Sequence, residues 1–510
     1  MNESQDQSQS LNELTKVRYQ KLKAYREQGI EPFPVSYERE HALAHILETC
    51  FPEGKEVLSE TLKTAGRVTT IRAMGKAAFF TIQDETTKMQ VYANDKTLSE
   101  QEHYILKNLD IGDIVGITGN AFLTKTEEKS IRASELKLLS KNLSPMPVRK
   151  EKEGEVYDAF ADVENRYRKR YLDLAVNPEV RENFRTRFKI IAAIRKFMTD
   201  KGFLEVETPM MQSVASGAAA RPFETWHNTL ERKLYLRIAP ELYLKRLIVG
   251  GFEKVFELNR NFRNEGISTK HNPEFTMMEV YQAYADFRTM MQLTEDLFLY
   301  VADSVFGRRK FQYGEVEIDF EKGWQKRGYL QSIKEETGID FEVFLNEREP
   351  SFEQAKKLAA DAKISVKEAN TFWEVVDIVF SEKVEPKLIQ PVFITDFPAA
   401  ISPLAKNAPG NPFIVERFEP YILGREMGNA FSELNDPDEQ LVRFQGQLDM
   451  KEAGAEETMP LDEDFIEALR VGMPPTGGLG IGIDRLVMLF TNSASIKDVI
   501  LFPMLRTKGK

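Results

Sequence analysis

Cysteine is almost absent from this sequence, because Cys50 stands alone among 510 residues. A single cysteine cannot form an intramolecular disulfide, and it excludes a zinc site built from several cysteines. We therefore expect any bound metal to be held by oxygen ligands. His41 and His45 stand four residues apart just before Cys50. This spacing is incomplete for zinc, and a surface helix explains it more simply.

Long apolar runs and nucleotide-binding signatures are also missing. No stretch of about 18 or more uncharged apolar residues occurs, and the first ten residues, MNESQDQSQS, are polar. Both features argue against a membrane span or a secretory signal, so we expect a cytoplasmic protein with no membrane partner. Neither G-x-G-x-x-G nor G-x-x-x-x-G-K-[ST] is present, which leaves dinucleotide-fold and P-loop binding without support.

The net charge of -11 looks unfavourable for a nucleic-acid binder until it is divided by region. Residues 1–150 carry 21 basic and 21 acidic side chains, so the whole acidic excess belongs to residues 151–510. Within residues 62–150, 14 basic side chains face 10 acidic ones. The N-terminal third is therefore more basic than the rest of the chain, and its net positive charge lies in residues 62–150. A basic, helix-compatible stretch around Arg18 and Lys21 fits this interpretation, and a solvated helix face explains that stretch equally well.

Three regions follow from the patterning. Residues 1–61 are expected to form a polar tail, disordered over 1–10, and a basic helix over 11–28 that ends at Gly29. Residues 62–148 contain five strand patterns with a helical stretch between the third and fourth, an order that matches the five-stranded oligonucleotide-binding barrel. Residues 149–510 are expected to form one large unit of alternating helices and strands, with a helical insertion near 331–390.

The first chemical signal is the stretch FELNRNFRNEGISTKHNPEFTMMEVYQAY at residues 256–284, which predicts two strands joined by a polar turn. Arg263 offers a planar fork of donors that suits a phosphate or a carboxylate. A structural ion pair with Glu265 is the alternative for this arginine.

A second signal is GGLGIGIDRLVMLF at 477–490, where closely spaced glycines lead into an apolar helix that carries Arg485 near its start. Glycines allow a backbone or nucleotide to approach closely, and an arginine beside a helix N-terminus suits phosphate. Between the two signals, residues 415–436 are rich in carboxylates, which are the ligands that magnesium prefers. A solvated acidic surface is the alternative for any one of these glutamates.

These stretches resemble motifs 2 and 3 of the class II aminoacyl-tRNA synthetases, and KGFLEVETPMM at 201–211 resembles their motif 1, which forms the homodimer interface. HIGH-type and KMSKS-type sequences of the other synthetase class are absent, in agreement. Over nearly the whole chain the sequence resembles the bacterial-type lysyl-tRNA synthetases of subclass IIb. The resemblance implies an α+β fold: an N-terminal five-stranded oligonucleotide-binding β-barrel and a catalytic domain built on an antiparallel sheet with flanking helices.

The resemblance also implies an activity and its participants. The enzyme would activate L-lysine with ATP to lysyl-adenylate and pyrophosphate, and then transfer lysine to the 3′ end of tRNA(Lys). Arg263 and Arg485 would be catalytic, with about three Mg²⁺ ions per active site held by Glu419 and Glu426. The residues implied for ATP are Arg263, Glu265, His271, Asn272, Phe275, Glu419 and Arg485. Those implied for lysine are Gly217, Glu241, Arg263, Glu279, Tyr281, Asn429, Phe431 and Glu433.

Chemistry agrees with lysine as the substrate, because an ammonium on a long apolar stem needs carboxylates and an aromatic wall. For the anticodon, the resemblance implies Arg72, Phe79, Gln90 and Glu135. Phe79 and Phe80 are adjacent on a strand, so we expect one ring in the core and one available as a stacking platform.

Two places depart from the family pattern. The family usually has PGGA before ARPF and a histidine pair after it, whereas this chain has Ala215, Ser216 and Trp226 there. Lys270 stands where many relatives carry arginine. Three rival functions remain: an aspartyl- or asparaginyl-type synthetase, a relative that lysylates a protein, and an inactive RNA-binding or signalling module. Acidic pocket residues disfavour the first, the barrel disfavours the second, and the intact ATP residues disfavour the third.

Overall fold

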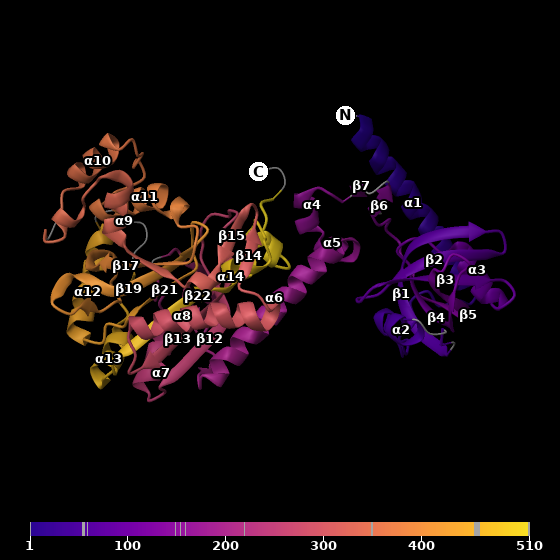
Figure 1. Ribbon diagram of the computed structural model, residues 1–510, viewed down its shortest axis with the longest axis horizontal. Helices are drawn as coiled ribbons and strands as arrows, with labels where there is room; N and C mark the ends of the chain where they lie inside the picture. Colours follow the sequence, from indigo (N-terminus) through magenta and orange to yellow (C-terminus); the bar gives the residue numbers. More distant parts are fainter. Residues whose placement is uncertain are drawn as a thin grey trace. The chain divides into compact units, whose positions relative to one another are not determined.

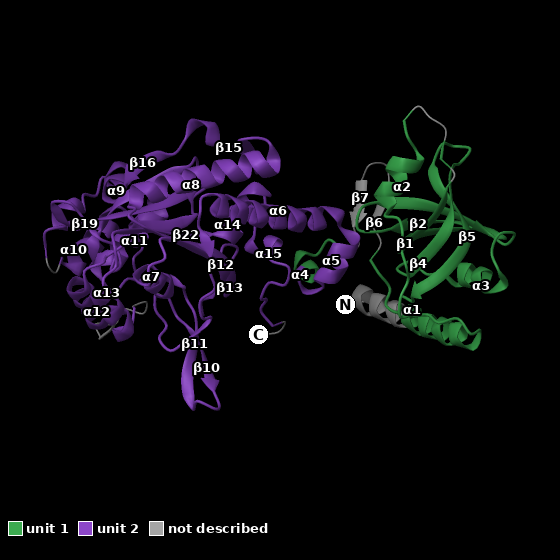
Figure 2. Cartoon of the chain, turned by 90° about the horizontal axis from the view of Figure 1, so that it is seen from below, with its two compact units in different colours: residues 1–166 green, residues 167–510 purple. Residues whose placement is uncertain are grey.

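The computed structural model describes residues 2–53, 57–58, 60–147, 149–152, 155–158, 160–218, 220–347, 350–452 and 459–507. The chain divides into two compact units, Met1–Arg166 and Tyr167–Lys510, which are coloured separately in Figure 2. Each unit has its own apolar core. In the described part of the chain, no helix is both long and apolar enough to cross a membrane.

The first unit is built on a closed barrel. Its strands, in the described residues, are β1 (Thr61–Met74), β2 (Ala77–Gln83), β3 (Lys88–Asn94), β4 (Ile114–Leu123) and β5 (Lys129–Ser140). They are hydrogen-bonded in the order β1-β2-β3-β5-β4, and β4 pairs with β1 to close the barrel. Helix α3 (Glu100–Asn108) lies between the third and fourth strands and begins at a capping box made by Ser99 and Glu102. The predicted five strands with one interrupting helix are confirmed.

Alternation decides which side chains enter the barrel. Along β2 the exposure alternates, so that Phe80 and Ile82 are buried while Phe79 and Thr81 stay half-buried on the outer face. Successive strand residues point to opposite faces, so a period of two yields one apolar and one available face. The expectation that one ring lies in the core and the other on the outer face is confirmed, and the stacking role stays a prediction.

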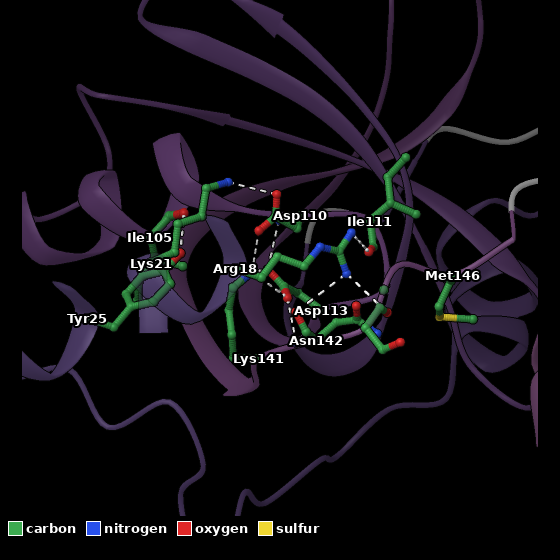
Figure 3. A network of polar contacts seen from close by, with 12 residues as sticks. Arg18, Lys21, Tyr25, Ile105, Asp110, Ile111, Asp113, Lys141, Asn142 and Met146 are labelled. Carbon is green, nitrogen blue, oxygen red and sulfur yellow. Dashed lines mark hydrogen bonds and ion pairs between the residues drawn. The ribbon is translucent and has the colours of Figure 1, made fainter. Parts of the chain in front are cut away.

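Helix α1 (Asn2–Glu27) is fixed to the barrel by a polar network (Figure 3). Arg18 donates to the carbonyls of Ile111, Asn142 and Ser144, at 3.1–3.4 Å. Lys21 donates to Asp110 at 2.7 Å, and the same carboxylate accepts a hydrogen bond from the fully buried Lys141 at 2.5 Å. Arg18 and Lys21 therefore belong to the packing of the first unit rather than to a solvated helix face.

Helix α1 also corrects one expectation, because it begins at Asn2 whereas the sequence favoured disorder over residues 1–10. Glutamate and glutamine have adequate helix propensity, and a helix that is already nucleated by docking extends at little cost. The short helix α2 (Leu43–Cys50) follows, with Cys50 buried. After the barrel, β6 (Arg149–Lys152) and β7 (Glu155–Asp158) pair as a hairpin. Two short helices come next, α4 (Val163–Arg168) and α5 (Arg170–Val176).

The second unit is built on a large sheet, whose order in the described residues is β16-β17-β19-β21-β22-β13-β12-β8. Figure 1 labels its strands β17, β19, β21, β22, β13 and β12. The strands are β8 (Leu204–Glu205), β12 (Lys254–Phe262), β13 (Glu274–Ala283), β16 (Gln325–Gly328), β17 (Val392–Pro398), β19 (Asn411–Ile422), β21 (Gly428–Ser432) and β22 (Thr476–Gly482). The two terminal pairs, β16 with β17 and β12 with β8, are parallel, and the pairs between them are antiparallel. The sheet is thus mixed at its edges and antiparallel at its centre.

Helices cover this sheet. Helices α6 (Pro178–Asp200), α8 (Phe287–Val301) and α14 (Ile483–Phe490) share one apolar cluster with the central strands. Helices α7 (Glu241–Val249), α12 (Pro437–Glu452) and α13 (Glu463–Val471) share another. The stretch 331–390 is mostly helical, and its helices pack with β17 and β19. They are α9 (Tyr329–Thr337), α10 (Phe352–Asp361) and α11 (Phe372–Lys383).

The smaller strands lie beside this framework. Strands β9 (Met211–Gln212), β10 (Phe223–His227) and β11 (Arg232–Leu236) form a small sheet. Strands β14 (Lys310–Tyr313) and β15 (Val316–Asp319) form a hairpin. Strands β18 (Asn407–Ala408) and β20 (Arg425–Glu426) both pair with β19. The motif 2 stretch is thus the antiparallel pair β12 and β13, and the motif 3 stretch is β22 followed by α14.

Candidate active site

A cavity of about 410 Å³ opens over the centre of the large sheet. Its walls follow from strand alternation, since every second residue of a strand faces the same side. Strand β13 contributes Phe275, Met277, Glu279 and Tyr281. The stretch through β21 contributes Asn429, Phe431 and Glu433 on the same principle. The side chains at alternate positions of both strands therefore point into the same cavity.

Strand β22 supplies the floor between these two walls, because it pairs with β21 on one side and β13 on the other. Its residues on this side are glycines, Gly478, Gly480 and Gly482. A Cβ at Gly478 would stand 1.8 Å from Glu433 Oε1 and 2.8 Å from Tyr281 Cε1, so only glycine fits. The glycines that the sequence singled out therefore make room for the neighbouring side chains.

One end of the cavity is strongly acidic. Glu241 of α7, Glu279 of β13 and Glu433 are all buried. Burial, together with the charge of Glu241, raises the pKa of Glu279 to about 8. Burial also raises the pKa of Glu241 and of Glu433, although the charge of Lys245 opposes both shifts. Tyr281 donates to Glu279 at 3.2 Å. This end of the cavity is suited to a ligand that carries ammonium groups.

Arg263 lies where the polar turn begins after β12. Its guanidinium stands over the Phe275 ring, 5.2 Å from the centroid. Its buried Nε has no hydrogen-bond partner, and it makes no ion pair with Glu265 or any other carboxylate in the described ranges. The structural ion pair considered as the alternative is therefore not formed. Arg263 is available to an anionic ligand, and Phe275 offers a ring beside it.

Arg485 lies in the first turn of α14, and its guanidinium contacts Glu426 and His271. Its Nη1 donates to the Glu426 carbonyl at 2.6 Å and stands 3.4 Å from the Glu426 carboxylate. Its Nη2 lies 3.2 Å from His271 Nε2. Because a guanidinium only donates, His271 Nε2 must accept, which requires a neutral ring. Burial and the charge of Arg485 lower the pKa of His271, in agreement.

Glu419 and Glu426 form a second acidic cluster in the cavity wall. Glu419 accepts hydrogen bonds from Arg417 at 2.5 Å and from Tyr421 at 2.9 Å. Burial, opposed by the charge of Arg417 and assisted by the charge of Glu426, raises the pKa of Glu419 to about 7. A divalent cation between two such carboxylates would relieve this repulsion, and their hard oxygen atoms fit magnesium. Within the described ranges no group of three acidic, histidine or cysteine side chains is close enough to hold a metal alone.

The cavity brings together every residue that the resemblance implied for ATP, lysine and magnesium. The lining includes Gly217, Glu241, Arg263, Glu265, His271, Asn272, Phe275, Glu279, Tyr281, Glu419, Glu426, Asn429, Phe431, Glu433 and Arg485. Sequence reasoning missed Arg417, which also lines the cavity and donates to Asn429 Oδ1 at 2.9 Å. Its position two residues before Glu419 on β19 was the available signal, since strand residues two apart share a face.

The barrel carries a separate candidate surface. Arg72 of β1 pairs in register with Phe79 of β2, and Phe79 pairs with Tyr92 of β3. The Phe79 and Tyr92 rings stand 4.9 Å apart, and Gln90 donates to Ser130 at 3.0 Å. Arg72, Phe79 and Gln90 thus share one outer face. Glu135 of β5 instead accepts a hydrogen bond from Thr118 of β4 at 2.9 Å.

Two further aromatic residues extend this outer face. Tyr92 lies 6.3 Å from the Phe122 ring, and the Arg132 guanidinium stands 4.7 Å over Phe122. Aromatic rings on an outer face with nearby arginines are a surface on which unpaired nucleic-acid bases stack. Tyr92 stands two residues after Gln90, so alternation alone could have found it. Phe122 comes from a distant strand and has no such signal.

The departures from the family pattern lie beside the cavity. Gly217 lines it with φ of +92°, and a Cβ there would meet Glu241 Cβ at 3.2 Å. Ala215 and Ser216 precede it, and Ser216 donates to Asp462 at 3.4 Å. Trp226 lies on β10 with 59% of its surface exposed. Lys270 lines the cavity at the end where His271 and Arg485 meet.

Comparisons with known proteins bear on this arrangement. A family described as "tRNA synthetases class II (D, K and N)" matches residues 162–506, and an "OB-fold nucleic acid binding domain" matches residues 62–139. A "Lysine--tRNA ligase" of Carboxydothermus hydrogenoformans is 51% identical over 98% of this chain and 99% of its own length. That of Pelotomaculum thermopropionicum is 51% identical over 99% of the chain and 97% of its own length. That of Bacillus subtilis is 47% identical over the whole of both.

Proposed function

The chain belongs to the lysine–tRNA ligases of the class II tRNA synthetases, and from this premise we propose how its cavity selects lysine and activates it with ATP. The proposal rests on one observation: the same cavity has an acidic region and a basic region. Glu241, Glu279 and Glu433 form an acidic end, Arg485 stands at the other, and Arg263 lies between them. Lysine carries ammonium groups and ATP carries phosphates, so each substrate has a matching end.

We assign the acidic end to lysine. Glu433 and Glu279, with the Tyr281 hydroxyl, receive the side-chain ammonium, and Glu241 receives the α-ammonium beside Gly217. Phe431 provides an aromatic wall for the stem and Asn429 a polar contact. An aspartate substrate would place its carboxylate among three buried carboxylates, which is electrostatically unfavourable. The acidic end therefore favours lysine over aspartate and asparagine.

Arg263 stands between the two ends and carries the chemistry of the first step. Its unpaired Nε and its fork of donors suit the lysine carboxylate and the α-phosphate at once, so the attacking oxygen and phosphorus are held together. Charge grows on the phosphate oxygens during the attack, and a guanidinium fixed over Phe275 stabilises it without reorganisation. Pyrophosphate leaves, and a ribose hydroxyl at the tRNA 3′ end then attacks the carbonyl carbon of the adenylate and displaces AMP.

The remaining ATP contacts follow from the lining residues. Phe275 offers a face for the adenine ring, and Glu265, His271 and Asn272 line the cavity beside it. Arg485, kept in place by the Glu426 carbonyl, is positioned for the γ-phosphate. Glu419 and Glu426 would hold magnesium, which neutralises phosphate charge when bound. No side-chain nucleophile is required by this mechanism.

We propose that the barrel, residues 62–148, binds the anticodon of tRNA(Lys), and that residues 149–510 form the catalytic domain. Phe79 is the stacking platform, Arg72 and Gln90 are the neighbouring contacts, and Glu135 is a further candidate for reading a base. The added ring of Tyr92 supports this assignment. We place the activity in the cytoplasm, where tRNA is charged for protein synthesis.

We further propose a homodimer through the motif 1 stretch. Strand β8 lies at the edge of the large sheet, which leaves one side without a strand partner among the described residues. Phe188, Leu204 and Met211 in this neighbourhood are each more than half exposed. Exposed sheet edges and clustered apolar side chains are usually covered by another chain. Sedimentation equilibrium at two protein concentrations tests this, and a monomer at micromolar concentration would contradict it.

ATP–pyrophosphate exchange with each of the twenty amino acids tests the central assignment. We expect exchange with lysine alone, and Glu433→Gln should lower kcat/KM for lysine by about 30-fold or more, because removing a buried charge partner costs about 2 kcal/mol or more. The exposed Glu353→Gln on α10 is the matched control and should match the wild type. Exchange with aspartate or asparagine would refute the pocket assignment, and no exchange at all would favour the inactive module.

A further inference from the structure

Lys245 is a buried ammonium behind the lysine pocket. It lies on α7, one helical turn after Glu241, and its side chain has no exposed surface. Its Nζ donates to Glu241 Oε1 at 2.6 Å and forms a second ion pair with Glu433 Oε2. The rings of Phe431 and Phe465 stand 5.5 and 5.8 Å from the same nitrogen. Lys245 does not line the cavity, so it acts on a ligand only through these two glutamates.

The charges around the pocket do not balance without Lys245. Glu241, Glu279 and Glu433 supply three carboxylates, whereas lysine brings two ammonium groups, and its own carboxylate is met by Arg263. Lys245 offsets the third carboxylate, which leaves two negative charges for two ammonium groups. An unpaired buried charge is unfavourable because it has lost its hydration and gains no compensating interaction. The balance therefore depends on a cation that belongs to the protein.

Other charged and titratable groups near this place are committed to different partners. Arg237 pairs with Glu257 at 2.7 Å, and Arg246 pairs with Asp462 at 2.9 Å. Arg417 pairs with Glu419, and Tyr281 donates to Glu279. Among the described residues, Glu433 forms an ion pair with Lys245 and with no other basic side chain. Its charge lowers the pKa of Glu433 and Glu241 against the effect of burial.

We propose that Lys245 is a positioning residue for lysine selection, which holds Glu241 and Glu433 in place and, once bound lysine has ionised the three carboxylates, leaves the pocket with two net negative charges. The inference rests on the proposed function of this pocket. Because Glu433 Oε2 is bound to Lys245, Oε1 is the oxygen that faces Gly478 and Tyr281, where the substrate ammonium would arrive. A ligand with an uncharged end, such as norleucine, leaves one carboxylate unmatched and is rejected.

Lys245→Met tests the proposal, since methionine keeps an unbranched apolar stem and removes the charge. We expect KM for lysine to rise about tenfold or more, with KM for ATP within about twofold of the wild type. The acid limb of the pH profile of kcat/KM for lysine should move to higher pH, because the three carboxylates then hold protons more tightly. Lys356→Met on the exposed face of α10 is the control.

Two further variants separate charge from structure. Lys245→Arg keeps the charge and should leave the acid limb unmoved, whatever its effect on KM. Glu241→Gln combined with Lys245→Met restores two net negative charges and should return the limb towards the wild-type position. If Lys245→Met does not fold, the pH profiles of these two variants still test the proposal.

An unchanged KM for lysine in Lys245→Met would overturn the proposal. So would a loss by the same factor at every pH, because a merely structural role lowers activity without moving the limb. Wild-type protein that shows no lysine-dependent exchange would instead overturn the proposed function of the pocket, so the two failures are distinguishable.

Discussion

The carboxylate of Glu433 lies directly against the backbone of Gly478, since a Cβ at position 478 would stand 1.8 Å from Glu433 Oε1. Gly478→Ala must therefore push Glu433 away from the pocket. We predict that this substitution raises KM for lysine about tenfold or more and changes KM for ATP little, because the residues that we assign to ATP lie away from Gly478 in the cavity. Amino-acid-dependent pyrophosphate exchange measures both constants.

Gly446→Ala provides the control for this prediction. Gly446 lies on α12, and a Cβ at this position would meet nothing within 4 Å, so the substitution has open space. An alanine there should leave both KM values unchanged. A wild-type KM for lysine in Gly478→Ala would show that lysine binding does not depend on the position of the Glu433 carboxylate.

The elements that the sequence revealed are those with a strong local period. Alternation in residues 77–83 and 88–94 predicted β2 and β3, and the polar turn between two alternating stretches predicted β12 and β13. The hairpin of β6 and β7 and the two-residue strand β8 have no such pattern, because four or fewer residues carry too little periodicity. Their pairing is decided by neighbours in space.

The site residues divide in the same way. Glu279 and Tyr281, or Asn429, Phe431 and Glu433, could be grouped from alternation and family resemblance. Lys245 could not, because in ELYLKRLIV it has the appearance of an ordinary helix-surface lysine. Lys245 is buried against Glu433, which comes 188 residues later in the sequence, so no local pattern connects the two residues. Long-range electrostatic partners are the part of a site that a single sequence conceals.

A buried ion pair positions the helix that carries Arg485. Arg187 of α6 donates to Asp484 Oδ1 at 2.6 Å, and Asp484 Oδ2 accepts from the Thr276 backbone at 2.7 Å. We predict that Asp484→Asn destabilises the second unit by about 3–5 kcal/mol, because it leaves the Arg187 charge buried without its partner. Calorimetry should show a lower melting temperature for that unit, and exchange should show a raised KM for ATP.

The matched control is Asp303→Asn, which removes an exposed pair with Arg309 at 2.8 Å. Exposed pairs contribute little, so its melting temperature should match the wild type. Equal losses in both variants would mean that the buried position of Asp484 is not what matters.

Phe79 is expected to matter for tRNA and not for lysine activation. Stacking of one base on an aromatic ring contributes about 1–3 kcal/mol, so Phe79→Ala should raise the Kd for tRNA(Lys) by about 5- to 150-fold. Phe79→Tyr keeps the ring and should remain close to the wild type. Pyrophosphate exchange without tRNA should be unchanged in both variants. Reduced exchange in Phe79→Ala would indicate a folding defect rather than a lost platform.

Lysine affinity should depend on pH through the buried carboxylates. The pKa of Glu279 is about 8 in the free protein, so below that pH the group is mostly protonated. An arriving ammonium favours the ionised form, and binding must then expel a proton. Affinity should therefore rise with pH from 6 towards 8 and fall at higher pH, once the ammonium groups of the free lysine lose their protons.

The same shift links pH to stability. A folded-state pKa raised above the ordinary value of 4.5 means that the folded protein binds the proton more tightly than the unfolded chain. Between 4.5 and about 8 the unfolded chain has released that proton while the folded protein keeps it, so the contribution of Glu279 to stability falls as pH rises. Bound lysine compensates the ionised carboxylate, so its stabilising effect on the melting temperature should be larger at about pH 8.5 than at about pH 6.

Calorimetric titration of lysine in two buffers of different ionisation enthalpy measures the expelled proton. We expect proton release at pH 6.5 that diminishes towards pH 9, and a smaller release in Glu279→Gln, where only Glu241 and Glu433 remain with raised pKa. Heats that are independent of the buffer at pH 6.5 would show that these carboxylates are already ionised in the empty pocket. The acidic end would then be held charged by cations such as Lys245 before lysine arrives, and the affinity for lysine would be flat over this range of pH.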